Sequence, residues 1–120
     1  DQLSEGLVVT RGLDRSLFLY PKREWERLAQ KLAALPLGKS DTRAFARLML
    51  AGAMEADVDA SGRVTIPPYL RDYAQLSKRV IVTGLYDRLE IWDEETWETY
   101  STRTEDEGND IAERLSDLGL

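Results

Sequence analysis

Short β-branched runs and longer helical stripes alternate along this chain. The runs Val8–Thr10 and Val80–Thr83 predict strands, because β-branched residues favour a pleated surface. A second strand is predicted after each run, at Leu17–Tyr20 and Leu89–Trp92. The pattern therefore predicts two strand-turn-strand units, one near each end of the chain.

Two helical segments are predicted between these units. Apolar residues recur with a helical period over residues 21–34, and the run 35–38, Leu-Pro-Leu-Gly, interrupts it. Ser40 or Asp41 can cap a second helix that continues to about Leu50. These helices can cover the sheet or form an interface between subunits, and the sequence leaves both uses open.

The two strand units form an internal repeat. Residues 8–26 align with residues 80–98 without a gap at an offset of 72, and six positions are identical. Gly12 and Gly84 fall in the two turns, where we expect them to supply a positive φ. A duplicated unit explains this similarity better than chance.

Each copy then opens a helix. Pro21 suits a helix-opening position in the first copy, because its missing N–H is not needed there. Asp93 can cap the corresponding helix in the second copy. We expect Trp25 and Trp97 to face the preceding strands and to have a packing role.

The second copy is preceded by a segment that the first copy lacks. Within it, 56–58 predicts a strand, 59–62 a turn, 64–66 a returning strand, and 69–74 a short helix. Because residue 54 minus the offset of 72 falls before residue 1, we expect about twenty residues of a first opening hairpin to be absent from this sequence.

Composition narrows the chemistry of the chain. Cys and His are both absent, which removes disulfides, a thiol nucleophile, and the commonest general base and zinc ligand. We expect no metal, cofactor or small-molecule substrate, and no membrane segment. The net charge is −6, but residues 93–120 carry −8 and residues 1–92 carry +2. An acidic tail therefore masks a mildly basic body, which leaves room for a nucleic-acid partner.

One segment carries a specific motif. Residues 59–71, DASGRVTIPPYLR, follow the pattern Asp-x-x-Gly-Arg-x-x-Ile-Pro-x-x-x-Arg. This pattern resembles the SpoVT-AbrB group of swapped-hairpin DNA-binding domains. Together with residues 8–21 and 89–98, the segment resembles the MraZ family in particular, whose members carry two such domains in tandem.

The resemblance implies a fold and a function. The fold is α+β: a double-split β-α-β, swapped-hairpin, AbrB-like barrel built from two tandem repeats with added helices. The chain is expected to close into a ring of identical subunits and to bind double-stranded DNA at direct repeats upstream of its own operon. It would regulate the division and cell-wall gene cluster, usually as a repressor, in the cytoplasm at the nucleoid.

The expected organisation divides the chain into four parts. The remainder of the first SpoVT-AbrB domain spans 1–26, connecting helices span 27–52, the second domain spans 53–98, and an acidic tail spans 99–120.

The resemblance assigns DNA contact to Arg63, positioned by Asp59, and to Arg71, with Gly62 forming the turn. A guanidinium can grip guanine or phosphate with two parallel hydrogen bonds. A local Arg63–Asp59 salt bridge is the structural alternative. Arg71 can instead form an ion pair with Asp72 or Asp87. We expect the adjacent bases Lys78 and Arg79 to be solvated on a loop.

Three other functions are alternatives to a DNA-binding regulator. An enzyme could use carboxylate pairs such as Asp57 with Asp59 or Glu94 with Glu95, but no nucleophile or phosphate loop accompanies them. An antitoxin or protein-interaction module could use the tail, where Ile111, Leu115 and Leu118 have helical spacing. A structural ring without DNA binding is the third alternative.

Overall fold

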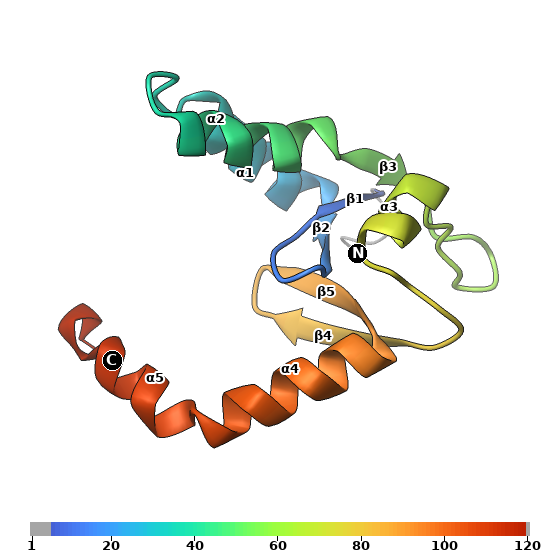
Figure 1. The fold of residues 1–120 in the computed structure, drawn as a ribbon. Coiled ribbons are helices and arrows are strands. Elements are labelled where there is room, and N and C mark those ends of the chain that lie inside the picture. The colour runs from blue at the N-terminus through green and yellow to red at the C-terminus, as the bar shows by residue number, and fades with distance from the viewer. Residues whose placement is uncertain (1–5, 120) are drawn as a thin grey trace.

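The computed structural model describes residues 6–119 and contains one sheet with helices around it (Figure 1). The sheet has five strands in the order β3-β1-β2-β5-β4. All of its strand pairs are antiparallel. The strands are β1 (Leu7–Arg11), β2 (Leu17–Pro21), β3 (Met54–Ala56), β4 (Val80–Leu85) and β5 (Arg88–Asp93).

Helices connect and extend these strands. In chain order they are α1 (Lys22–Ala33), α2 (Ser40–Ala46), the π-helix η2 (Arg47–Ala51), α3 (Pro68–Tyr73), α4 (Glu94–Asp106), α5 (Gly108–Arg114) and the 3₁₀ turn η3 (Ser116–Leu118). The predicted helix over residues 40–50 is thus α2 followed directly by η2. Lys39, without a side-chain cap bond, is its N-cap, so the predicted cap at Ser40 or Asp41 is wrong.

The two repeat units meet at the pairing of β2 with β5. Leu17 pairs with Ile91, Phe18 with Glu90, and Leu19 with Leu89. With the offset of 72, exchanging the two strands leaves these pairs unchanged. The units are therefore related by an approximate twofold axis that passes between Phe18 and Glu90.

Each face of the sheet carries a core. On one face, residues of β1, β2 and β5 pack with Leu70 and Ala74 of the α3 segment. On the other face, Phe18 and Tyr20 pack with Leu32 and Met49 from the α1–η2 layer. Trp25 lies 5.9 Å from Tyr20 between ring centroids, and Trp97 lies 5.2 Å from Trp92, which confirms the packing role predicted for both.

The hairpin turns differ from the prediction. Neither Gly12 nor Gly84 has a positive φ, and the left-handed residues are Asp14 and Arg15 in the first turn and Tyr86 in the second. Gly12 serves a steric purpose instead, since a Cβ there would lie 2.6 Å from the Phe18 ring.

The repeat alignment also shifts within the units. Val9 pairs with Leu19, whereas Val82 pairs with Ile91, the counterpart of Leu19. The structural offset is therefore 73 between β1 and β4 and 72 between β2 and β5. The cause is a second turn that is one residue shorter. The matches of Val8 with Val80 and Gly12 with Gly84 are consequently off by one.

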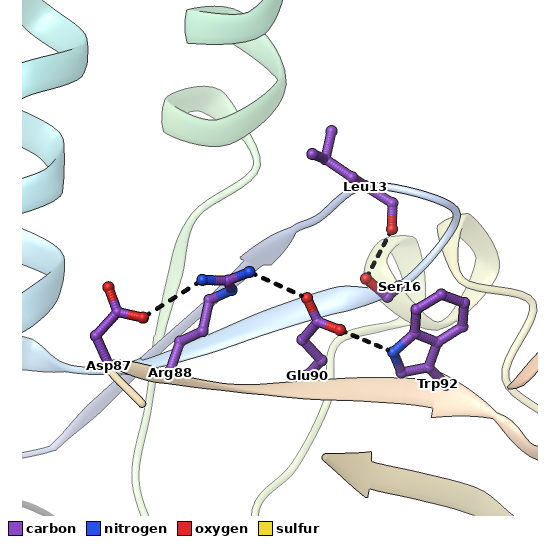
Figure 2. Close-up of polar contacts among 6 residues, drawn as sticks. All are labelled: Leu13, Ser16, Asp87, Arg88, Glu90 and Trp92. Carbon is purple, nitrogen blue, oxygen red and sulfur yellow. Dashed lines mark hydrogen bonds and ion pairs between the residues drawn. The ribbon is translucent and has the colours of Figure 1, made fainter. Parts of the chain in front are cut away.

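A charged cluster lines the seam between the units (Figure 2). The Arg88 guanidinium lies between the Asp87 and Glu90 carboxylates, at 3.3 and 3.4 Å, and 4.6 Å from the centre of the Phe18 ring. Glu90 also accepts a hydrogen bond from Trp92 Nε1 at 3.1 Å. The ion pairs and the stacking on the Phe18 ring thus offset the cost of removing these charged side chains from water.

The α+β class is confirmed, whereas a closed barrel is not formed. Within residues 6–119 the sheet is open, with β3 and β4 at its two edges. The opening hairpin that the repeat predicts for the first unit lies outside the described residues.

Candidate nucleic-acid interface

The Asp59–Arg63 turn is held by the Asp59 side chain. Asp59 Oδ1 accepts hydrogen bonds from the backbone N–H groups of Ser61 and Arg63, each at 2.8 Å. The Asp59 N–H in turn donates to the Arg63 carbonyl at 2.9 Å. Asp59 therefore fixes the backbone of Arg63, while the Arg63 side chain is exposed.

The salt bridge between Arg63 and Asp59, the structural alternative to DNA contact, is not among the ion pairs of the described residues. Within residues 6–119, the ion pairs join other side chains, and none links the Arg63 guanidinium to Asp59. The carboxylate instead satisfies backbone donors, as Asp does in many turns. This arrangement leaves the guanidinium able to reach a ligand.

Gly62 adopts the positive φ that its position predicts. Its φ is +80°, and a Cβ would meet no atom within 4 Å. Side chains other than Gly are strained in this conformation whatever space surrounds them. The turn is therefore built on Gly62 and Asp59 together.

The flanks of the turn are less regular than predicted. Only one bridge, between Val58 and Val64, joins them, so the predicted strands 56–58 and 64–66 are not formed as such. Val58, Val64 and Ile66 pack against the core cluster that includes Val9 and Leu17. The turn thus projects outward from an apolar base that rests on the sheet.

Helix α3 is fixed to the sheet by two tyrosines. The Tyr69 hydroxyl donates to the Gly52 carbonyl at 2.8 Å, at the end of η2. The Tyr73 hydroxyl donates to the Gly12 carbonyl at 2.7 Å, in the first hairpin. Because Leu70 and Ala74 are also buried, α3 has a defined orientation. Arg71 lies on its exposed side.

The two predicted arginines, Arg63 and Arg71, lie on one continuous segment, and no hydrogen bond or ion pair of the described residues connects them. Arg71 forms no ion pair with Asp72 or Asp87 among the described residues, and Asp87 pairs with Arg88 instead. Lys78 and Arg79 are exposed on the loop that follows α3. Over residues 57–79, four bases oppose three acids, so the segment is only slightly basic.

Sequence reasoning missed the residues that position this segment. Tyr69 and Tyr73 were assigned no role, although their spacing of four places them on one face of a short helix. The loop of the first hairpin also contributes, since the Arg15 guanidinium lies 5.0 Å from the centre of the Tyr73 ring. Only the three-dimensional structure brings residues 12–15 beside α3.

The carboxylates considered for catalysis do not form a catalytic pair. Asp57, Asp59 and Glu95 are exposed, and Glu94 begins α4. In the described part of the chain, no group of three or more acidic side chains could hold a metal ion. No helix there is long and apolar enough to cross a membrane.

Comparisons with known proteins agree on one family. A family model described as "MraZ protein, putative antitoxin-like" matches twice, over residues 1–48 and 49–118. The chain is 46% identical to a transcriptional regulator MraZ of Oenococcus oeni and 47% identical to one of Thermoanaerobacter sp. strain X514. Each alignment covers the whole chain and 84% of the relative. The chain belongs to the MraZ family.

Proposed function

We propose that this chain is a DNA-binding transcriptional regulator that contacts double-stranded DNA through the Asp59–Arg63 turn and Arg71. The observation that carries the proposal is the exposed Arg63 side chain on a backbone that Asp59 holds with two hydrogen bonds of 2.8 Å. A preorganised guanidinium loses less freedom on binding and can make bidentate contacts with guanine or phosphate. The relatives' names, transcriptional regulator MraZ, agree with this function.

The finer assignment follows the family resemblance. The chain acts as a repressor at direct repeats upstream of its own operon, within the division and cell-wall gene cluster. It works in the cytoplasm at the nucleoid, where that DNA lies. Direct repeats suit an oligomer, because identical subunits at regular spacing combine weak contacts into tight binding.

We also propose the swapped-hairpin organisation and a ring of identical subunits. Segment 54–74 belongs by sequence to the second repeat, yet it pairs with β1 and packs on the core of the first. This exchange is what two intertwined domains would produce. The boundaries 1–26, 27–52, 53–98 and 99–120 are kept as the proposed parts of the chain.

The test is a titration of DNA from the region upstream of the gene. Arg63→Ala should lower affinity by at least about tenfold, since one good base contact contributes about 1–3 kcal/mol. Arg71→Ala should lower it too. Affinity of the unmodified protein should fall steeply as salt rises, because phosphate contacts release counterions.

Arg114→Ala is the matched control, because Arg114 is exposed on α5, far along the chain from the turn. Its native mass is measured beside its DNA affinity, because α5 lies in the acidic tail and a changed oligomer would also change affinity. It should leave DNA affinity unchanged. Thermal melting should show that all three variants remain folded. Equal loss of affinity in Arg63→Ala and Arg114→Ala would contradict the assignment of the turn, and a flat salt dependence would argue against a DNA partner.

A protein-neutralising role is the second candidate, favoured by the antitoxin-like description of the family model. The acidic tail with its exposed Leu115 and Leu118 would be the contact surface. Co-purification of a toxin encoded beside the gene, lost when both leucines are replaced by serine, would support it. The two tandem repeats fit a regulator better, since related antitoxins usually carry one such domain.

A further inference from the structure

Two helical arms leave the sheet in different directions (Figure 1). We call residues 22–47 the basic arm; they form α1, the turn after it, α2 and the first residue of η2. We call residues 94–118 the acidic arm; they form α4, α5 and η3. The basic arm has seven bases and three acids, a charge of +4. The acidic arm has nine acids and two bases, a charge of −7. The largest opposite charges of the chain are therefore concentrated on two separate projections.

The opposite charges of the two arms do not form ion pairs with each other among the described residues of one chain. The basic arm joins the sheet through α1 and η2, and the acidic arm joins it through α4. In Figure 1 the sheet lies between them. The ion pairs of the described residues involve Lys22 with Glu55, Arg27 with Glu24, and the Arg88 cluster. No ion pair in that set connects one arm to the other.

Each arm also exposes apolar side chains toward its free end. Leu118 is 71% exposed and Leu115 39% exposed, and both follow Ile111 at helical spacing in the sequence. On the basic arm, Leu37 is 71% exposed at the turn, and Phe45 is 37% exposed on α2. Exposed apolar side chains within a polar surround are typical of a surface that meets a partner.

We propose that the acidic arm of one copy docks on the basic arm of a second copy. The stripe Ile111–Leu115–Leu118 would bury its apolar side chains against Leu37 and Phe45, with charges of opposite sign at the rim. Charge complementarity selects this partner, because like arms repel each other and opposite arms attract. The inference rests on the homo-oligomer proposed above and names its interface.

The pairing explains how a ring would form. The two docking surfaces are different parts of the chain, so the contact is heterologous and leaves one arm of each type open in a dimer. Adding copies repeats the same contact until the first and last copies meet. One interface used repeatedly gives a closed ring when the rotation between neighbouring copies closes, and the DNA-binding turns are then carried at equal intervals.

The experiment reverses charge on each arm in the full chain and measures native mass against concentration. Lys31→Glu with Lys39→Glu should raise the concentration needed for half-assembly by at least about tenfold, and Glu113→Lys with Asp117→Lys should do the same. All four changes together restore complementarity and should return assembly toward the unmodified level. Lys78→Glu with Arg79→Glu, which changes net charge equally on a loop outside both arms, should have little effect.

A second pair of variants tests the apolar contact. Leu115→Ser with Leu118→Ser should weaken assembly without lowering the melting temperature of the subunit, because both side chains are exposed. If assembly is unaffected when the charge of either arm is reversed, the proposed interface is wrong, although the proposal of a homo-oligomer is not contradicted. If the variant with all four changes does not regain assembly, the proposed interface is also wrong. Loss of DNA binding without a change in mass would identify the basic arm as a DNA surface instead. A monomeric unmodified protein would overturn the oligomer and this interface together.

Discussion

The two repeat units have the same elements but different cores. In the first, β1 and β2 are buried on both faces, by the α3 segment on one side and by α1 and η2 on the other. In the second, α4 packs on one face of β4 and β5, and the other face is largely open within residues 6–119. Val9 is fully buried, whereas its structural counterpart Val82 is 56% exposed.

The difference comes from the segment that follows η2. Residues 54–74 stand directly before β4 in the sequence, yet they pair with β1 and cover the first unit. Equivalent apolar patterns therefore predict equivalent strands but not equivalent burial. Burial depends on which distant segment packs on the strand. The contribution of an apolar side chain to the free energy of unfolding increases with the area that is buried.

The sharpest way to break this comparison is to truncate corresponding leucines at the seam. Leu17 is fully buried and its counterpart Leu89 is 37% exposed. Leu17→Ala should lower the free energy of unfolding by about 2–5 kcal/mol, because it leaves a cavity in the core. Leu89→Ala should cost about 1 kcal/mol or less, since partly exposed sites lose little packing. Chemical denaturation measures both, and equal losses would show that the two units have equivalent cores.

The two turn glycines give the next largest difference. Neither has a positive φ, so only space decides the outcome. A Cβ on Gly12 would lie 2.6 Å from the Phe18 ring and 2.9 Å from the Ser16 carbonyl oxygen, and on Gly84 it would lie 3.7 Å from Leu89. Gly12→Ala should therefore destabilise the protein by about 1–3 kcal/mol through overpacking. Gly84→Ala should be neutral or stabilising by up to about 1 kcal/mol, because Ala restricts the unfolded chain. A stable Gly12→Ala protein would mean that the Phe18 ring moves aside readily.

Local patterns predicted β1, β2, β4 and β5, the main helices, the packing of both tryptophans and the φ of Gly62, but the predicted strands at 56–58 and 64–66 do not form. They failed on the turns, because Gly12 is required by the neighbouring Phe18 ring and not by its own φ. They also failed on register. Val80, Ile81 and Val82 are all β-branched, so an ungapped alignment with Val8 looks correct although the strand is shifted by one residue.

The candidate site was predicted in part. The exposed turn, its glycine and the position of Arg63 follow from the motif, because turn chemistry is local. The role of Asp59 in holding the backbone was correctly anticipated, but the anchoring of α3 by Tyr69 and Tyr73 was not. Their acceptors, Gly52 and Gly12, are separated from them by 17 and 61 residues, and no local pattern reports such contacts.

In acid, we expect a pH dependence of stability from Asp93 of the second unit. Asp93 stands where the first unit has Pro21, and it is 6% exposed. Its carboxylate accepts hydrogen bonds from the Ser77 hydroxyl at 2.7 Å and the Ser77 N–H at 3.0 Å. The backbone N–H groups of Glu95 and Thr96 in the first turn of α4 also favour the ionised carboxylate. The hydroxyl bond lowers the pKa of Asp93 below its ordinary value of 3.8.

Because this pKa is lower in the folded state, the ionised carboxylate stabilises the protein above pH 3.8, and the contribution is lost as the pH falls through the folded-state pKa. Ser77→Ala should lower the free energy of unfolding by about 1.5 kcal/mol at neutral pH. The difference from the unmodified protein should shrink in acid. Ser61→Ala, on an exposed turn, is the control. A Ser77→Ala loss that stays constant down to acid pH would show that Asp93 is not responsible.

The smallest expected effect distinguishes the two hairpin turns. Tyr86 has a φ of 60° and Asp14 a φ of 57°, and both lie in the left-handed region. That conformation costs an ordinary residue roughly 1–2 kcal/mol, whereas Asp tolerates it because its side chain bonds locally. Gly removes this strain but loses about 0.4–1 kcal/mol through the freedom of the unfolded chain.

Tyr86→Gly should therefore raise the free energy of unfolding by about 0.5 kcal/mol, while Asp14→Gly should leave it nearly unchanged. Because the Tyr86 side chain is fully exposed, no lost packing offsets the gain. Denaturation midpoints of the two variants, compared at equal m-value, decide the matter. A clear loss in Tyr86→Gly would show that this side chain makes a contact in the assembled protein that the isolated subunit lacks.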